Sequence, residues 1–137
     1  MKLAGVIHAK GESNRVYRKN FRLVDGVPLY LIQAINMTSV LDRRDIYIDS
    51  DDPEILMTGE INGFSVIKRP KQFASNAVGG VQLMEIFLDS VPCDLVIQAF
   101  PPAPFFDGNM LRSMLDKLLK GGYKSCMLSN SQNLYTW

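Results

Sequence analysis

Short apolar segments alternate with segments of helical periodicity along most of this chain. Segments with branched or alternating apolar residues, typical of strands, cover residues 3–9, 45–49, 64–67, 94–100 and 125–129. Helical spacing covers residues 28–41, 81–88 and 107–120, and a further helix begins at residues 51–54. This alternation predicts an α/β fold in three layers (α/β/α), with a mostly parallel sheet, right-handed crossovers and helices on both faces. We expect residues 1–137 to form one domain.

Helix-capping residues support these boundaries. Residues 51–54 read Asp-Asp-Pro-Glu, so an Asp can cap the helix, a proline fits its first turn and a Glu suits its positive end. Asn62-Gly63 is expected to end this helix, and Gly121-Gly122 to end the helix over 107–120.

The first strand-like segment runs directly into a polar loop with four cations, Lys10, Arg15, Arg18 and Lys19. Gly11 and Ser13 keep this loop small, and we expect its backbone N–H groups to face outward. Amide dipoles and fixed cations together meet the charge of a polyphosphate. The loop therefore predicts a nucleotide site, with Arg18 and Arg22 individually expected at the surface.

Ligands of parallel α/β sheets bind above the carboxyl ends of the strands. The loops expected at that edge are residues 10–20, 49–52, 69–80 and 98–106. The first loop matches neither GxGxxG nor GxxxxGK[ST], so neither a dinucleotide fingerprint nor a P-loop is indicated.

Charge and cysteine content exclude several classes of protein. The net charge is +1, whereas a general nucleic-acid surface needs a clear basic excess, so we expect no nucleic acid partner. Cys93 and Cys126 lie far apart and the chain has one histidine, which argues against a zinc site. Both cysteines are expected to be buried, reduced thiols.

The chain shows no sign of membrane insertion or export. Met1-Lys2 leads directly into a short strand candidate, and no apolar run reaches membrane-spanning length. We expect a cytoplasmic protein without a membrane partner.

Some polar residues have two interpretations. Asp49, Asp51 and Asp52 are a candidate metal cluster, but Pro53-Glu54 favours a helix cap. His8, within the first strand, is better explained as a hydrogen-bonded core histidine than as a catalytic base. Gln98 fits a ligand contact and a loop hydrogen bond equally well.

Residues 9–20 resemble a known motif. They read Ala-Lys-Gly-Glu-Ser-Asn-Arg-Val-Tyr-Arg-Lys-Asn, which is similar to Ala-Arg-Gly-Gly-Ser-Lys-Arg-x-Pro-x-Lys-Asn at the N-terminus of the CMP-sialic acid synthetases, the acylneuraminate cytidylyltransferases. Five further segments resemble motifs of this family in the same order, at residues 25–29, 49–55, 69–70, 74–77 and 98–102. The resemblance covers nearly the whole chain.

The resemblance implies a nucleotide-diphospho-sugar transferase-like fold with a Rossmann-like half. It also implies a reaction in which CTP and a nine-carbon 2-keto sugar acid give a CMP-sugar and pyrophosphate. It implies a triphosphate site at Lys10, Gly11, Ser13, Arg15 and Lys19, with Arg15 and Lys19 as the catalytic cations. Asn20 would shape the nucleotide site, and Arg69 and Gln98 would lie near the base or ribose.

The family's Mg²⁺ ligands and most of its acceptor pocket lie in a second half, and this chain stops about where that half begins. We therefore expect Mg²⁺ as a cofactor, but no metal ligand within these residues. A sheet cut at that point leaves an unpaired edge, which favours a homo-oligomer.

Departures from the family motifs keep three hypotheses open. Glu12 replaces a glycine, Gly79-Gly80 stand where a base-contacting serine is usual, and Phe100-Pro101 replace two hydroxyl residues. The hypotheses are a sialate-activating cytidylyltransferase, a non-catalytic relative that self-associates or binds nucleotide weakly, and a nucleotidyltransferase for another sugar class.

Overall fold

A computed structural model describes residues 1–75 and 77–129 of the chain. Its centre is a four-stranded parallel sheet in the order β5-β4-β1-β6. The strands are β1 (Leu3–His8), β4 (Ile46–Ser50), β5 (Ser65–Lys68) and β6 (Leu95–Ala99). Because all four strands run in the same direction, their carboxyl ends meet at one edge of the sheet.

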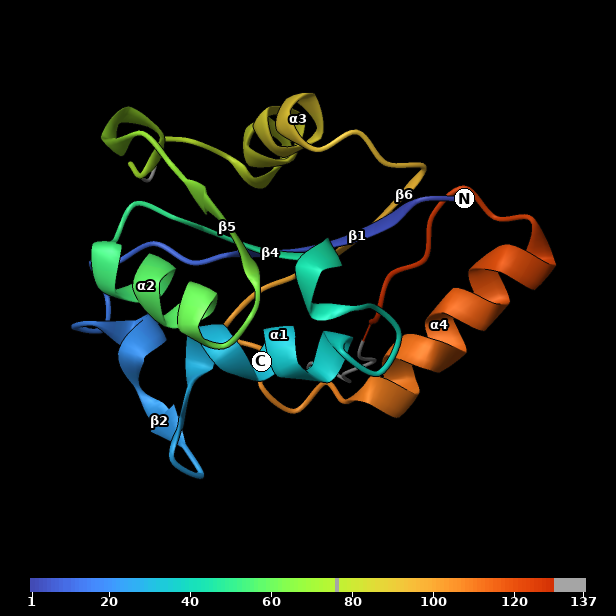
Figure 1. Cartoon of the computed structure of the whole chain (residues 1–137), viewed down its shortest axis with the longest axis horizontal. Coiled ribbons are helices and arrows are strands. Elements are labelled where there is room, and N and C mark those ends of the chain that lie inside the picture. The colour runs from blue at the N-terminus through green and yellow to red at the C-terminus, as the bar shows by residue number, and fades with distance from the viewer. Residues whose placement is uncertain (76, 130–137) are drawn as a thin grey trace, which may run out of the picture.

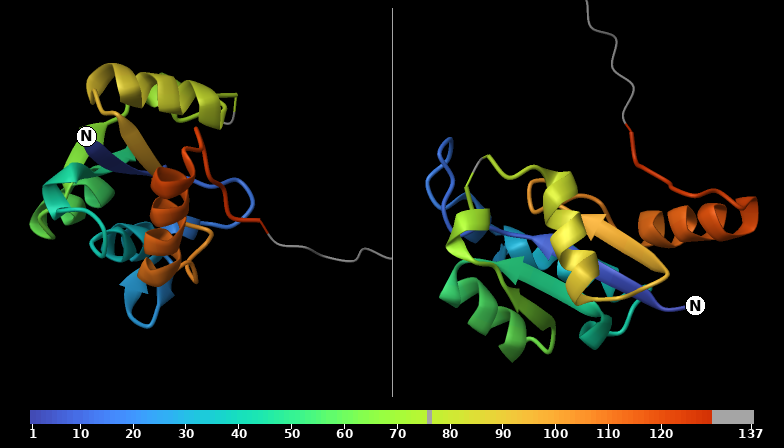
Figure 2. Two further views of the ribbon diagram at one scale, coloured as in Figure 1. Left: turned by 90° about the vertical axis from the view of Figure 1, so that its right-hand side faces the viewer. Right: turned by 90° about the horizontal axis from the view of Figure 1, so that it is seen from above.

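Helices cover both faces of this sheet (Figure 1, Figure 2). One face carries α1 (Leu29–Met37), α2 (Pro53–Ile61) and α4 (Gly108–Gly121), and the other carries α3 (Gly80–Ser90). The predicted three-layer α/β architecture is confirmed.

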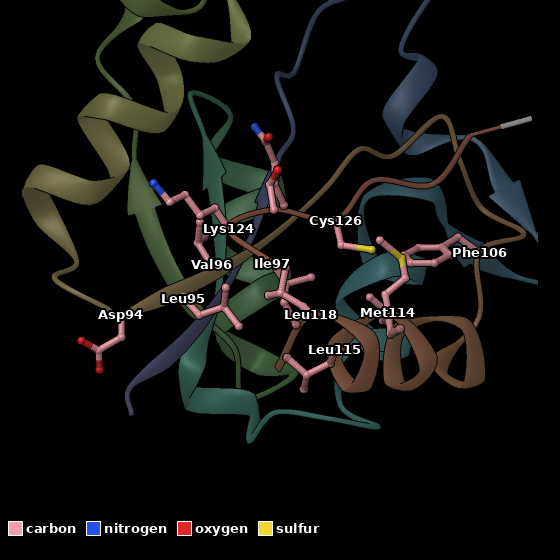
Figure 3. Close-up of a pocket in the computed structure, with 13 residues that line it drawn as sticks. Asp94, Leu95, Val96, Ile97, Phe106, Met114, Leu115, Leu118, Lys124 and Cys126 are labelled. Atoms are coloured by element: carbon pink, nitrogen blue, oxygen red, sulfur yellow. The ribbon is translucent and has the colours of Figure 1, made fainter. Parts of the chain in front are cut away.

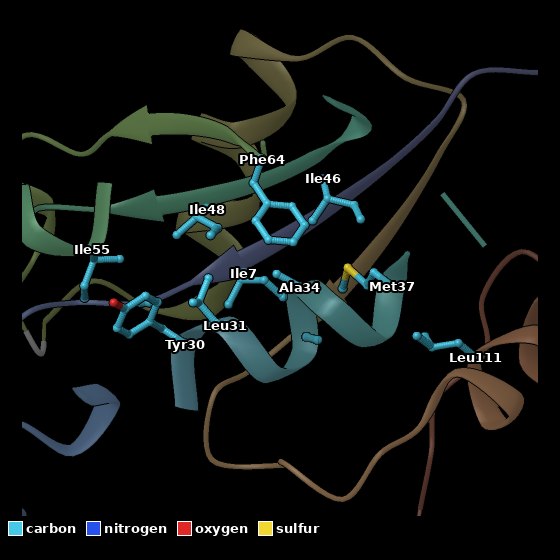
Figure 4. Close-up of a cluster of buried hydrophobic side chains, with 12 residues drawn as sticks. Ile7, Tyr30, Leu31, Ala34, Met37, Ile46, Ile48, Ile55, Phe64 and Leu111 are labelled. Carbon is cyan, nitrogen blue, oxygen red and sulfur yellow. The ribbon is translucent and has the colours of Figure 1, made fainter. Parts of the chain in front are cut away.

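Two apolar clusters hold the layers together. The larger cluster, between the sheet and α1, α2 and α4, buries Ile7, Tyr30, Met37, Ile48 and Ile55 among others (Figure 4). The smaller one packs Phe87 of α3 and Val91 against Ala4 and Val6, with the Tyr47 ring edge-on to Phe87 at 5.6 Å. Strands buried on both faces read as continuous apolar runs, which is why β1 was recognisable in the sequence.

The expected caps are confirmed. Asp52 Oδ1 accepts hydrogen bonds from the backbone N–H groups of Glu54 (2.8 Å) and Ile55 (3.3 Å), with Pro53 at the first position of α2. Gly122 ends α4 in the left-handed conformation with φ 64°. A side-chain N-cap such as Asp52 contributes about 1 kcal/mol to stability.

A small hairpin precedes α1 and was missed in the sequence. Strands β2 (Leu23–Val24) and β3 (Val27–Pro28) pair around Asp25 and Gly26, whose φ angles are 49° and 76°. Two adjacent positive φ angles are typical of a tight hairpin turn, for which Asp-Gly is a favoured sequence. Three short 3₁₀ helices complete the connections: η1 (Lys19–Phe21), η2 (Arg43–Asp45) and η3 (Lys71–Phe73).

The loop after β6 is tied to α1. Asn36 Nδ2 donates to the Phe106 carbonyl at 2.6 Å, and Gln33 Nε2 donates to the Ala103 carbonyl. These bonds fix the proline-containing segment that bounds the candidate site.

Two expectations about the C-terminal part are wrong. Residues 125–129 form no strand, because they pair with none of the described strands and Met127 is 85% exposed. Cys126 is exposed rather than buried, whereas Cys93 is partly buried and burial raises the pKa of its thiol. Among the described residues, no helix is long and apolar enough to cross a membrane.

Candidate functional site

A cavity of about 390 Å³ lies at the carboxyl ends of the strands, where the sequence predicted the ligand site. The first loop, the segment after β5, the start of α3 and the loop after β6 line it. Its polar lining is His8, Lys10, Glu12, Ser13, Lys19, Asn20, Arg69 and Ser75, and its apolar lining includes Phe73, Val78, Leu83 and Phe100.

Gly11 is required by a close approach of two loops. A Cβ built on Gly11 would lie 2.6 Å from Asp52 Oδ2 and 2.7 Å from Asp52 Cβ, so a larger residue would displace the cap of α2. The Gly11 N–H donates to Asp51 Oδ1 at 3.0 Å. The sequence predicted that the N–H groups of this loop face outward. For Gly11 that prediction is wrong, because its N–H is directed to Asp51.

Asn20 shapes the loop from inside. It is buried, and its Nδ2 donates to the Lys10 carbonyl at 2.7 Å, which closes the loop between Lys10 and Lys19. Its Oδ1 is buried and has no hydrogen-bond partner among the described residues.

Arg18 holds the first loop in place through two contacts at the surface. It has a left-handed backbone (φ 46°), and its guanidinium lies 3.9 Å from the centre of the Phe21 ring and 2.8 Å from the Glu54 carboxylate. The hydrogen bond to Glu54 raises the Arg18 pKa. Arg18 and Arg22 are both exposed, as predicted.

A buried charge network lies at the floor of the site. His8 Nδ1 is 2.7 Å from Asp49 Oδ2, and Arg69 donates to the same carboxylate through Nη2 at 2.7 Å and through Nε at 3.1 Å. The three residues are at most 7% exposed. Burial alone raises the pKa of Asp49, but the hydrogen bonds from His8 and Arg69 outweigh it and hold this pKa below its ordinary value.

Five predicted site residues meet at this cavity: Lys10, Ser13, Lys19, Asn20 and Arg69. Gly11 lines two adjoining hollows with Asp52, and Arg15 is exposed on the loop. Gln98 lies elsewhere, on β6, which is at the edge of the sheet formed by the described residues.

Gln98 borders a second cavity of about 350 Å³ beside α4 (Figure 3). Its walls are β6, the apolar face of α4 with Met114 and Leu118, and the extended segment with Lys124 and Cys126. The roles assigned to Gln98 and Arg15 by resemblance therefore remain predictions.

Sequence reasoning missed the linkage of His8 to Asp49. His8 does have a partner at Nδ1, as expected of a core histidine, but its Nε2 has none among the described residues. The available signal was the register: His8 pairs with Asp49 at the carboxyl ends of two neighbouring parallel strands. Only the strand order reveals that pairing.

Asp51 and Asp52, next to the first loop, stabilise the fold through hydrogen bonds to the backbone. Asp51 accepts the Gly11 N–H and Asp52 caps α2, as the cap interpretation predicts. Among the residues that the structure describes, no three His, Cys, Asp or Glu side chains are grouped to hold a metal ion.

Comparison with solved structures defines the class of fold. A CMP-2-keto-3-deoxy-manno-octonic acid synthetase complexed with CTP matches with a TM-score of 0.69 and 19% identity, over 89% of this chain and 49% of that one. A cytidylyltransferase from Leptospira borgpetersenii matches with a TM-score of 0.67 and 18% identity, over 88% of this chain and 50% of that one. The fold is thus the Rossmann-like fold of nucleotidyltransferases, and cytidylyltransferases are among its solved examples.

A third match is the bifunctional IspDF from Campylobacter jejuni, with a TM-score of 0.63 and 16% identity, over 88% of this chain and 31% of that one. The chain spans half or less of the length of these three proteins. No family model and no curated protein sequence matches it.

Proposed function

We propose that this chain binds a cytidine nucleotide in the cavity above β1 and β5, as the nucleotide-binding part of a cytidylyltransferase. The observation that carries this proposal is the convergence of Lys10, Lys19 and Arg69 on one cavity at the carboxyl ends of the strands. The fold shared with a synthetase described as complexed with CTP supports the choice of nucleotide.

The lining of the cavity offers groups suited to both parts of a nucleotide. Lys10, Lys19 and the first residue of α3, Gly80, supply positive potential for phosphates. Phe73 and Phe100 offer apolar surface for a base or a ribose. Positioning and charge neutralisation of this kind account for most of the catalysis in phosphoryl and nucleotidyl transfer.

The finer parts of the proposal rest on resemblance. The acceptor would be a 2-keto sugar acid of the sialic acid type, with Arg15 and Lys19 stabilising the charge on the departing pyrophosphate. Mg²⁺ would neutralise further phosphate charge. Among the described residues no three His, Cys, Asp or Glu side chains are grouped to hold this ion, and we assign it no ligand here.

A second candidate is a relative that has kept the fold without the catalysis. Glu12 is exposed and lines the same cavity as Lys10 and Lys19, so its carboxylate repels a triphosphate. Such a protein would act by self-association or weak nucleotide binding. The edge strand β6 has sheet partners on only one side among the described residues, which suits a homo-oligomer.

Calorimetric titration of the 137-residue chain with CTP, with and without Mg²⁺, tests the proposal, with ATP as the control nucleotide. We expect saturable binding of CTP that is tighter than binding of ATP. Equal affinity for both nucleotides contradicts cytidine selectivity, and no binding of either favours the non-catalytic relative.

Glu12→Gln is expected to tighten CTP binding about two- to five-fold, because it removes one partly screened negative charge and keeps the side-chain shape. The matched control is Glu85→Gln on α3, which removes the same charge without being among the residues that line the cavity. Unchanged affinity in Glu12→Gln would show that the carboxylate turns away from the ligand. Titration at low and high salt separates the electrostatic part of the effect.

A further inference from the structure

The two nitrogens of the His8 ring have different surroundings. Nδ1 lies 2.7 Å from Asp49 Oδ2, and the side chain is 3% exposed. Nε2 is buried and has no hydrogen-bond partner among the described residues. His8 is among the residues that line the cavity and Nδ1 is engaged by Asp49, so Nε2 is the ring nitrogen left for a hydrogen bond with a ligand.

Asp49 fixes which nitrogen carries the proton. Its carboxylate accepts from Arg69 Nη2 and Nε, and an ionised carboxylate only accepts hydrogen bonds. Nδ1 of His8 must therefore be the donor, which leaves a lone pair on Nε2 of the neutral ring. A second proton can bind only at Nε2.

The charged groups near His8 come from three segments of the chain. Asp49 of β4 and Arg69 after β5 contact each other and balance their charges, and the Phe100 ring lies 6.4 Å from the imidazole. The first loop contributes Lys10, Lys19 and Glu12 to the cavity lining. Two lysines oppose a further positive charge, and a bound polyphosphate removes that opposition.

We propose that His8 is a proton-linked phosphate ligand. When the polyphosphate of the nucleotide enters the cavity, Nε2 takes up one proton from solvent and donates it in a hydrogen bond to a phosphate oxygen. No covalent bond forms or breaks. The inference rests on the proposed function and adds a pH dependence to it: the site binds polyphosphate more tightly as the pH falls toward the range in which histidine is protonated.

The chain's single histidine makes the ring directly observable. Long-range ¹H–¹⁵N spectra of the wild-type protein at about pH 7.5, where histidine side chains are mostly neutral, should show a ring that carries its proton on Nδ1. Addition of tripolyphosphate, and separately of CTP, should convert Nε2 to the protonated form. A ring that stays neutral when ligand is bound overturns the proposal.

Proton uptake gives a second readout. Calorimetry in buffers of different ionisation enthalpy should show about 0.5–1 proton taken up per tripolyphosphate by the wild type, and a clearly smaller uptake by His8→Asn. The asparagine side chain keeps a donor toward Asp49 and lacks an atom equivalent to Nε2, and circular dichroism checks that this variant folds. The affinity of His8→Asn should be about 3–10-fold weaker at about pH 6 and close to wild type at about pH 8.5.

The two ligands separate this inference from the proposed function. Proton-linked binding of tripolyphosphate, with CTP bound no more tightly than ATP, supports the role of His8 and rejects the cytidine site. CTP-selective binding with equal proton uptake in both proteins supports the site and rejects the role of His8. Binding of neither ligand rejects both.

Discussion

Asp49→Ala is expected to lower the free energy of unfolding by about 3–5 kcal/mol, because removal of one partner of a buried ion pair leaves the other charge buried and uncompensated. Arg69 is 5% exposed and its guanidinium gives three hydrogen bonds to the Asp49 carboxylate and one to the Asp49 carbonyl. His8 Nδ1 would lose its partner as well. Urea unfolding followed by circular dichroism measures the effect.

Asp116→Ala is the matched control. Asp116 pairs with Lys120 at 3.2 Å on the exposed face of α4, and both side chains are more than half exposed. Exposed i,i+4 pairs contribute about 0.3–0.5 kcal/mol, so this variant should unfold nearly like the wild type. If Asp49→Ala costs no more than Asp116→Ala, the buried network does not form in solution.

The same network predicts the response to acid. The pKa of Asp49 is lower in the folded than in the unfolded chain, so the unfolded state binds the proton more readily. The stability contributed by Asp49 is therefore fully present above the ordinary Asp pKa of about 3.9 and is lost as the pH falls through the lower folded-state value. Asp49→Asn should flatten this part of the curve of unfolding free energy against pH.

Lys19→Ala is expected to weaken CTP binding about 10- to 100-fold, the equivalent of one charge-assisted hydrogen bond to a phosphate. Lys19 begins η1 at the end of the first loop and lines the cavity with Lys10 and Arg69. Its side chain is half-buried, so its ammonium group is less free than a surface lysine to move away from a bound anion. Calorimetric titration with CTP measures the loss.

Lys117→Ala is the control for net charge, because Lys117 is exposed on α4, beyond the walls of this cavity. It should bind CTP like the wild type. Equal binding by Lys19→Ala and the wild type would remove the first loop from the nucleotide site. Equal weakening in both variants would point to a general effect of charge.

Local sequence signals predicted most of the secondary structure. The caps of α2 and α4 involve residues two to four positions apart, and both were recognisable from residue types alone. The missed hairpin at Asp25-Gly26 also has a local signal, since Asp-Gly favours a tight turn, but its two strands have only two residues each and show no periodicity. The prediction of a strand over residues 125–129 was wrong because a strand needs a pairing partner, and the residues of the segment itself do not indicate one.

The sequence predicted where the candidate site lies, but only some of the residues that line it. The rule that ligands bind at the carboxyl ends of parallel strands, together with the cations of the first loop, located the cavity. It did not reveal that the Gly11 amide is used by Asp51, or that Gln98 faces a separate cavity beside α4. Side-chain direction in a strand alternates, so it depends on register and neighbours.

The alternation of strands and helices, the helix ends and the charge of the first loop follow from the order of the residues, because they depend on interactions within one turn or one loop. The network of His8, Asp49 and Arg69 arises from the tertiary fold, because its hydrogen-bonded pairs are 41 and 20 residues apart along the chain. Parallel pairing brings together strand ends that are distant along the chain. Burial of their polar side chains between these ends then joins His8, Asp49 and Arg69 in one hydrogen-bonded network. The burial of His8 Nε2 without a partner among the described residues follows from that packing, which no local pattern encodes.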